Sequence, residues 1–369
     1  MQRKATRGDA RKARPASTRP SHPAKTRRQV SVRSSAPGAR ARGSRADTAA
    51  ATAPKARPRA PLSDRQARML LNLEQTMSRR IMGKDDAVAR VARVVRVRMA
   101  QLDFRPDRPN GSFLLVGPTG VGKNELAYTL AESLYGSEEG VVSIDLAELA
   151  EESDLARLGV LPVPGSSDQA MEGILTSPVR AHPRAVVLLR GLERAHPSFQ
   201  TVLQQILEQG RLDDLLGPVF FNQAIIFVTT RPKRDESTAV EIGFSRTSLA
   251  PMDATRKRLE RSFSPDLLDS FNEIIELPPL TPEDVRRIAR YKVEAVLRRL
   301  QSRHRAIEVA ENVFENVIPE EQARLEGAAM LNRTLEDRLF NPLARFLLEH
   351  RRTRSVQVDM DGGNLRIRQ

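Results

Sequence analysis

A glycine-rich segment carries the clearest chemistry in this chain. It reads GPTGVGKN and stands between the apolar run FLLV and the helical pattern NELAYTLAESLY. The G-x-x-x-x-G-K spacing lets main-chain N–H groups turn inward around a phosphate, and the helix that follows adds a positive dipole end. Lys123 is placed to reach the β- and γ-phosphates of a nucleotide. We therefore predict an ATP or ADP site that contains Gly117, Pro118, Thr119, Gly120, Val121, Gly122, Lys123 and Asn124.

The last position of this loop departs from the usual pattern. Asn124 stands where Ser or Thr would place a hydroxyl on Mg²⁺. An amide oxygen can bind a hard cation, but it is longer and differently aimed. This change alone weakens magnesium binding without excluding it. A glycine-rich turn that binds no ligand is the alternative interpretation.

Arginines stand at the ends of two other apolar runs. Arg190 and Gly191 follow VVLL, and Arg231 follows AIIFVTT. In P-loop proteins that hydrolyse nucleotides, the first position is expected to carry carboxylates for magnesium and water. A guanidinium can instead bind phosphate with two parallel hydrogen bonds. We predict that Arg190 and Arg231 join a nucleotide site that does not depend on magnesium; the alternative is that they fill an empty pocket or pair with acids.

The elements around these motifs alternate between strand and helix patterns. The apolar runs FLLV, VVSI, VVLL, AIIFV and IIEL occupy 113–116, 141–144, 186–189, 224–228 and 274–277. Such alternation predicts an α/β fold with a parallel sheet that is covered on both faces. Upstream, the segment from Leu62 to Leu102 reads as two amphipathic helices, with Ile81, Met82 and Gly83 between them.

The pattern changes near Leu280. Thr281-Pro282-Glu283 is a helix-start signal before a long amphipathic helix, and a second helical region covers 332–350. SVQVDMDGGNLRI indicates a terminal hairpin. We predict a nucleotide-binding domain over 61–280 and a small α+β domain over 281–369.

The positive charge of the chain is concentrated at its N-terminus. The formal net charge is +14, and residues 1–60 contain 17 Lys+Arg against 2 Asp+Glu. This segment is rich in Arg, Ala, Ser and Pro, so it buries too little apolar surface to offset its ordering entropy and is predicted to be disordered. A solvated tail, an arm for an acidic or nucleic-acid partner, and a targeting segment remain open.

Composition excludes several functional classes. Cysteine is absent, which excludes disulfides, thiolate metal sites and thiol nucleophiles. No run approaches the roughly 20 apolar residues that span a bilayer, and the N-terminus lacks the apolar region of a signal peptide. The five histidines show no ligand spacing. We therefore assign no catalytic residue and no metal site, and we expect a cytoplasmic protein without a membrane partner.

Four longer segments share their residue types and order with a known family. RIMGKDDAV, GSFLLVGPTGVGK, LERAHPSFQTVLQQILEQGRL and FSPDLLDSFNEIIELPPL together resemble the second AAA+ module of Clp/ClpB-type disaggregases. The resemblance runs from about Leu62 to the last residue. It implies an AAA+ P-loop NTPase αβα sandwich with a parallel sheet, a small C-terminal α+β lid domain, and hexameric rings that thread polypeptide. It also implies that the segment from Ile81 to Gly83 lies against adenine, with Ile81 and Met82 as its site residues.

The same resemblance implies that the groups for ATP hydrolysis are replaced. The family's Asp-Glu pair becomes Arg190 and Gly191, while Glu193 matches a Glu that the family also has. The water-positioning Asn becomes Arg231, the arginine finger becomes Ser270, and the lid's sensing Arg becomes Ala329. The aromatic pore loop is replaced by residues 165–168. A missing arginine finger alone costs on the order of 10³–10⁵ in rate.

These replacements favour a degenerate Clp/ClpB-like protein that binds ATP or ADP and hydrolyses it poorly or not at all. It would act as a scaffold, adaptor or regulatory subunit of a protein-remodelling assembly, with protein partners that include Clp-type ring subunits in a homo- or hetero-oligomer. Two alternatives remain. One is an active ATP-dependent Clp-type chaperone in a mixed ring whose partner supplies the missing groups. The other is a nucleic-acid-associated protein that acts through residues 1–60.

Overall fold

The computed structural model describes residues 59, 61–159, 173–214, 216–231, 251–301, 306–318, 327–350, 353, 355–361 and 364–368. All of these belong to one compact unit, 53–369. The predicted tail, except Arg59, and the predicted pore-loop segment lie outside the described residues. Within the described part of the chain, the helices are too short or too polar to cross a membrane.

A five-stranded sheet carries the nucleotide-binding domain. Its strand order is β2-β3-β6-β1-β7, and every neighbouring pair is parallel. The strands are β1 (Gly111–Val116), β2 (Val141–Asp145), β3 (Val186–Arg190), β6 (Ile225–Thr230) and β7 (Glu273–Glu276). Each predicted apolar run falls on a strand, with its ends moved by a residue or two. The predicted parallel α/β sheet is therefore confirmed.

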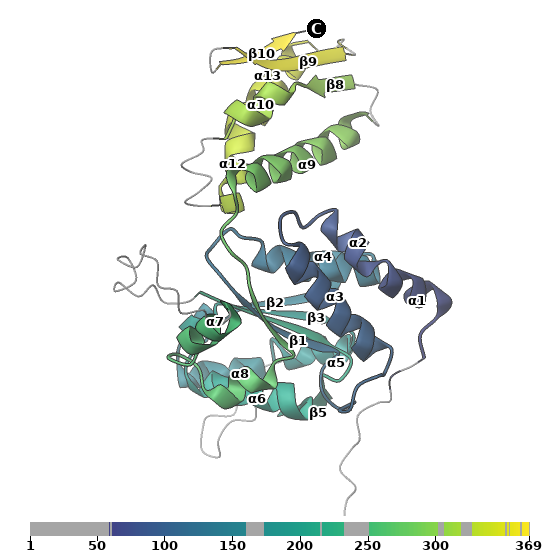
Figure 1. The fold of residues 1–369 in the computed structure, drawn as a ribbon, viewed down its shortest axis with the longest axis vertical. Coiled ribbons are helices and arrows are strands. Elements are labelled where there is room, and N and C mark those ends of the chain that lie inside the picture. Colours follow the sequence, from purple (N-terminus) through teal and green to yellow (C-terminus); the bar gives the residue numbers. More distant parts are fainter. Residues whose placement is uncertain are drawn as a thin grey trace, which may run out of the picture. The chain divides into compact units, whose positions relative to one another are not determined.

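Helices cover both faces of this sheet, with α1–α4 on one face and α5–α8 on the other (Figure 1). Side chains alternate between the faces of a strand. Phe113 and Leu115 therefore enter the core with α1–α4, while Leu114 and Val116 enter the core with α5–α8. The helices are α1 (Asp64–Leu71), α2 (Leu73–Ser78), α3 (Asp85–Met99), α4 (Lys123–Tyr135), α5 (Thr176–Ala181), α6 (Ser198–Gln209), α7 (Pro251–Leu259) and α8 (Pro265–Ser270).

The first predicted helix is broken into α1 and α2. Ser63 caps α1, since its hydroxyl accepts from the main chain of Gln66 while the Gln66 side chain accepts from the main chain of Ser63. Asn72 separates the two helices with a non-helical backbone (φ −95°, ψ 5°). The loop that follows α2 contains Ile81, Met82 and Gly83, as predicted.

Short elements join these main ones. β4 (Arg211–Asp214) and β5 (Gly217–Phe220) form an antiparallel hairpin. The 3₁₀ turns are η1 (Glu138–Gly140), η2 (Leu146–Glu148), η3 (Glu152–Leu158) and η4 (Leu192–Arg194). The turn η2 directly follows β2, and η4 follows β3 after Gly191, so both turns lie at the carboxyl edge of the sheet.

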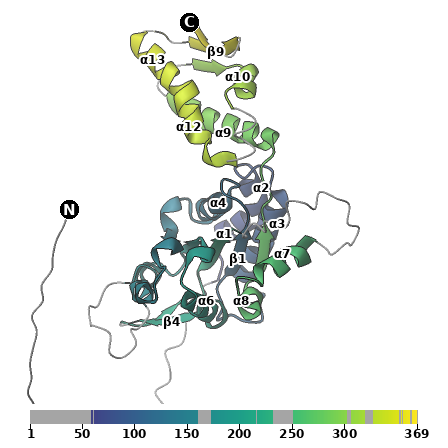
Figure 2. The same ribbon diagram turned by 90° about the vertical axis from the view of Figure 1, so that its left-hand side faces the viewer.

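The C-terminal residues form a small α+β domain with its own core (Figure 2). Its sheet has the order β10-β9-β8, with β9 and β10 antiparallel and β8 and β9 parallel. The predicted terminal hairpin is confirmed by β9 and β10, while the predicted second helical region contains the π-helical turn η7. The elements are α9 (Pro282–Gln301), β8 (Ala306–Val309), α10 (Glu311–Asn316), η6 (Gly327–Ala329), α12 (Leu331–Leu335), η7 (Glu336–Phe340), α13 (Asn341–Glu349), β9 (Ser355–Asp361) and β10 (Asn364–Arg368).

Candidate functional site

The predicted phosphate loop leaves β1 at Gly117 and enters α4 at Lys123. Gly122 precedes α4 in the left-handed region (φ 96°), which favours glycine. At Gly117, a Cβ atom would collide with the main-chain oxygen of Leu277. The tight path of this loop therefore depends on both glycines. The parallel register sets the ends of β3 and β6 beside it, because Val116 pairs with Thr230 and Arg190 pairs with Thr229.

The ammonium group of Lys123 folds back over this loop. Its Nζ donates to the carbonyl oxygens of Gly117 and Pro118, at 2.6 Å each. Burial, and to a smaller extent the charge of the nearby Arg231, lower the pKa of Lys123 to about 8, while Glu193 opposes both effects. The loop therefore holds a cation whose charge is incompletely balanced in the absence of a ligand.

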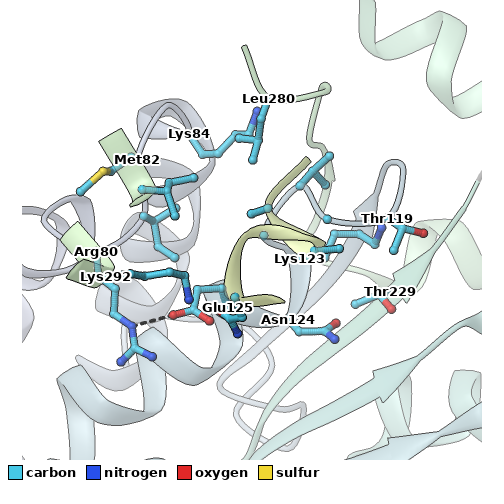
Figure 3. Close-up of a pocket in the computed structure, with 18 of the residues that line it drawn as sticks. Arg80, Met82, Lys84, Thr119, Lys123, Asn124, Glu125, Thr229, Leu280 and Lys292 are labelled. Atoms are coloured by element: carbon cyan, nitrogen blue, oxygen red, sulfur yellow. Dashed lines mark hydrogen bonds and ion pairs between the residues drawn. The ribbon is translucent and has the colours of Figure 1, made fainter. Parts of the chain in front are cut away.

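A cavity of about 880 Å³ opens over the loop (Figure 3). All of the sequence-predicted site residues line it except Gly117 and Pro118, whose carbonyl oxygens accept hydrogen bonds from Lys123. Arg80 and Met82 are on one side of the cavity, and Thr119 and Thr229 are on the other. Ile81 and Met82 therefore stand at the end away from the strand termini, where a base would lie if the loop held the phosphates.

Arg80 ties the Ile81–Met82 segment to the helix of the phosphate loop. Its guanidinium donates to Glu125 at 2.7 Å, to Glu138 at 2.6 Å, and also to Glu132. Burial disfavours the charge of Arg80, but the hydrogen bonds and charges of Glu138 and Glu125 outweigh it and raise the pKa of Arg80 above its ordinary value. Two walls of the cavity are thus connected through one side chain.

Arg190 occupies the end of β3 and pairs across the sheet. Its Nη2 lies 3.6 Å from Asp145 Oδ2, and Arg194 Nη2 lies 2.8 Å from Asp145 Oδ1. Asp145 is the residue opposite Arg190 in the β2–β3 register. The Nε of Arg190 is buried and has no hydrogen-bond partner among the described residues. One carboxylate therefore holds two guanidinium groups, and one of these keeps an unused donor.

Arg231 makes a similar contact at the end of β6. Its main-chain N–H donates to Glu193 Oε2 at 3.1 Å, and its Nε lies 3.8 Å from Glu193 Oε1. The adjacent Thr230 hydroxyl is buried without a hydrogen-bond partner in the described part of the chain. Both arginines therefore line the cavity and also pair with acids, so their contacts agree with either interpretation and their role in a nucleotide site stays a prediction.

These groups have the chemistry that a polyphosphate requires. Lys123, Arg190, Arg194 and Arg231 gather at one end of the cavity with Asp145 and Glu193, so cations outnumber acids among the described residues there. The unpartnered Arg190 Nε and Thr230 hydroxyl are buried donors that phosphate oxygens would satisfy. The loop, Lys123, Arg190 and Arg231 are the residues that would hold the phosphates.

Two other positions singled out from the sequence differ in their access to the cavity. Ser270 is only 2% exposed, and its hydroxyl donates to the Leu267 carbonyl at 2.6 Å. Ala329 lines the cavity, and the N–H of its neighbour Ala328 donates to the carbonyl of Gly120 at 2.9 Å. The short turn η6 therefore touches the phosphate loop, whereas position 270 is closed to solvent.

Some cavity residues were not predicted from the sequence. Asp145 and Arg194 were missed because their roles depend on strand register. Helix α9 contributes one face, whose residues recur at helical spacing. Such spacing predicts that the face is buried, but it does not predict which part of the protein the face contacts. These residues are Ile288, Tyr291, Lys292, Ala295, Val296 and Arg299.

Comparison with known proteins identifies families and relatives that this chain resembles. Residues 108–274 match the model of an AAA domain (Cdc48 subfamily), and residues 280–359 match that of the C-terminal, D2-small domain of ClpB protein. The chain is 36% identical over 299 residues to a chaperone protein ClpB of Meiothermus ruber, a match that covers 79% of this chain and 34% of that protein.

Two further relatives are ATP-binding subunits of ATP-dependent Clp proteases. ClpE of Streptococcus pneumoniae serotype 4 is 32% identical, with 84% of this chain and 41% of that protein covered. ClpC of Staphylococcus epidermidis is also 32% identical, with 83% of this chain and 38% of that protein covered. The chain thus spans between about a third and two fifths of the length of these relatives.

Proposed function

Because this chain belongs to the Clp/ClpB-type AAA+ family and carries the C-terminal lid domain of that family, we propose that it binds ATP or ADP without a need for magnesium and hydrolyses it poorly or not at all. Its role would be that of a scaffold, adaptor or regulatory subunit of a cytoplasmic protein-remodelling assembly. It would form rings with copies of itself or with other Clp-type subunits.

The observation that carries this proposal is the end of β3. The family resemblance puts an Asp-Glu pair at the positions of Arg190 and Gly191. Gly191 has φ 77°, and a Cβ atom there would lie 2.5 Å from the guanidinium of Arg194, which pairs with Asp145. A carboxylate side chain at 191 would need a strained backbone and a displaced Arg194. The left-handed backbone at this position therefore suits glycine and disfavours the side chain of a general base.

Two further sites support low turnover. Phosphoryl transfer depends on positioned charges, and a cation supplied by a neighbouring subunit is one of the largest contributions. Ser270 stands at the position of that cation and is closed to solvent. Ala329 reaches the cavity but has no charge to offer. Binding, in contrast, depends on the loop and Lys123, which retain the chemistry that a polyphosphate needs.

Nucleotide binding and phosphate release are measured on the whole chain to test this proposal. We expect saturable binding of a fluorescent ATP analogue, loss of that binding in Lys123→Ala, and phosphate release at background with or without Mg²⁺. Brisk, metal-dependent phosphate release that Lys123→Ala silences would contradict the proposal. Release that appears only with an added Clp-type ring would favour the active mixed-ring alternative.

Co-purification tests the proposed role in an assembly. The whole chain and a chain that begins at Pro58 serve as matched baits. We expect both to retain the same protein subunits, because the proposed contacts lie in the folded part. Retention of nucleic acid by the whole chain alone, removed by nuclease together with the other partners, would favour the alternative that residues 1–60 act on nucleic acid.

A further inference from the structure

We infer that magnesium opposes nucleotide binding at this site, because Arg190 takes the place that the metal ion would need. The inference rests on the proposed nucleotide binding and adds the form of the ligand, which is metal-free nucleoside triphosphate. It also assigns Asp145 as the group that competes with the phosphates for Arg190.

The side chains at the phosphate end do not fit Mg²⁺. This ion prefers hard oxygen ligands in a near-ideal octahedron, whereas an arginine offers five donors and no acceptor. The two carboxylates in reach are already engaged, Asp145 by Arg190 and Arg194, and Glu193 by Arg231. A metal ion would therefore have to displace guanidinium groups to gain either of these carboxylates as a ligand.

The charges at this end also favour the metal-free ligand. Lys123, Arg190, Arg194 and Arg231 outnumber the two carboxylates among the described residues of this wall. A divalent cation placed among them is repelled by each guanidinium, and it lowers the negative charge that the phosphates present to them. Metal-free triphosphate, by contrast, gains charge-assisted hydrogen bonds from the same groups.

The strand order places Arg190 within reach of the phosphates. Only β6 separates β3 from β1, so the end of β3 lies about 10 Å from the end of β1, after which the phosphate loop begins. An arginine side chain covers much of that distance. Arg190 and Thr230 both line the cavity, and the Nε of Arg190 and the Thr230 hydroxyl are buried without partners among the described residues. A bound phosphate oxygen would satisfy both donors.

Asp145 is arranged to release Arg190 without losing its own position. Its Oδ1 accepts from the N–H of Ala147 at 3.1 Å and from Arg194 at 2.8 Å, both shorter than its 3.6 Å contact with Arg190. The weaker contact is therefore the one that a phosphate would replace. Until then the Asp145 carboxylate competes with the phosphates for Arg190 and repels them.

Titration of the whole chain with ATP tests this inference at constant ionic strength, once with excess chelator and once with saturating Mg²⁺. We expect the dissociation constant to be about tenfold lower without metal, which corresponds to one charge-assisted hydrogen bond. Equal affinity under both conditions, or tighter binding with Mg²⁺, would overturn the inference and leave the proposed nucleotide binding intact. No binding under either condition would overturn both.

Variants then assign the effect to residues. Arg190→Gln should weaken metal-free binding about tenfold and bring the two conditions together, whereas Asp145→Asn should strengthen metal-free binding about threefold. Arg345→Gln and Asp86→Asn change charge by the same amounts on exposed side chains of α13 and α3, and should leave the ratio unchanged. If Arg190→Gln unfolds like the parent chain but keeps the preference for metal-free ATP, Arg190 does not have the assigned role.

Discussion

The charge of Lys123 connects its local environment to ligand binding. Burial holds the pKa of this side chain near 8 in the structure, well below the ordinary 10.5. Bound phosphates would favour the ammonium form and raise the pKa again. We therefore expect nucleotide binding near pH 8.5 to take up a fraction of a proton. Binding heats measured in buffers of different ionisation enthalpy give this number directly.

The control for proton uptake is Lys123→Arg, which keeps the charge but does not titrate in this range. Proton uptake of the same size in this variant would assign the uptake to another group.

The depressed pKa of Lys123 also sets how the free energy of unfolding changes with pH. Below pH 8 both the folded and unfolded chains carry the proton, and between about 8 and 10.5 the folded chain alone loses it. This group therefore makes the ligand-free protein more stable as the pH rises through that window.

At the residue scale, the sequence predicts side chains whose role follows from a local motif. The loop around Lys123 was predicted from spacing alone, and Arg190 and Arg231 from their places at strand ends. Asp145 could not be predicted, because its contacts with Arg190 and Arg194 depend on the β2–β3 register. The predicted roles of these residues in binding remain predictions.

At the element scale, one residue of the segment predicted to be disordered packs against the folded domain. Arg59 lies in the segment predicted to be disordered, yet its side chain is only 8% exposed and bonds Asp103 at 2.6 Å. It also donates to the carbonyl oxygens of Asn222 and Arg108, at 3.0 and 2.9 Å. These contacts of Arg59 could not be predicted from the sequence, because Arg59 is one arginine among many in this segment and its partner Asp103 is 44 residues away.

Two matched truncations test the Arg59 anchor. A chain that begins at Pro58 keeps Arg59, and a chain that begins at Pro61 lacks it. The second leaves Asp103, which is 5% exposed, with Arg98 at 3.6 Å as its remaining ion pair. We expect its free energy of unfolding to be about 2–3 kcal/mol lower, because a buried charge loses most of its compensation. Denaturant unfolding measures the difference, and equal midpoints for the two chains would show that Arg59 anchors nothing.

Among the other elements, those with a local sequence signal were predicted, and those that depend on long-range packing were not. The strands were predicted because short apolar runs of this kind are local signals, and all five are present. The break at Asn72 and the π-helical turn at Glu336–Phe340 were not predicted, because the amphipathic pattern continues through both. Packing, rather than periodicity, determines where these helices change their course.

At the scale of the whole molecule, the described residues form three separate apolar cores. Two lie on the faces of the five-stranded sheet, and the third contains residues from Leu280 onward. Lys84 contacts the chain just before the third core begins, since its Nζ donates to the carbonyl of Pro278 at 2.8 Å. We propose a domain boundary near Leu280, as predicted from the change in sequence pattern. The contribution of α9 to the cavity was not predictable, because it depends on how the chain folds back after that boundary.

Separate cores predict separate unfolding steps, and one pair of variants can show them. Leu203 of α6 is fully buried in the core on the α5–α8 face of the sheet, and Leu331 of α12 is fully buried in the core of the C-terminal domain. Each change to alanine should cost about 2–5 kcal/mol. We expect Leu331→Ala to lower the temperature of one thermal transition and Leu203→Ala to lower that of another, because the cores share no residues.

Nucleotide should raise the temperatures of both transitions in the parent chain, since residues of both domains line the cavity. A single transition that both variants lower equally, in calorimetry without nucleotide, would show instead that the domains unfold as one unit.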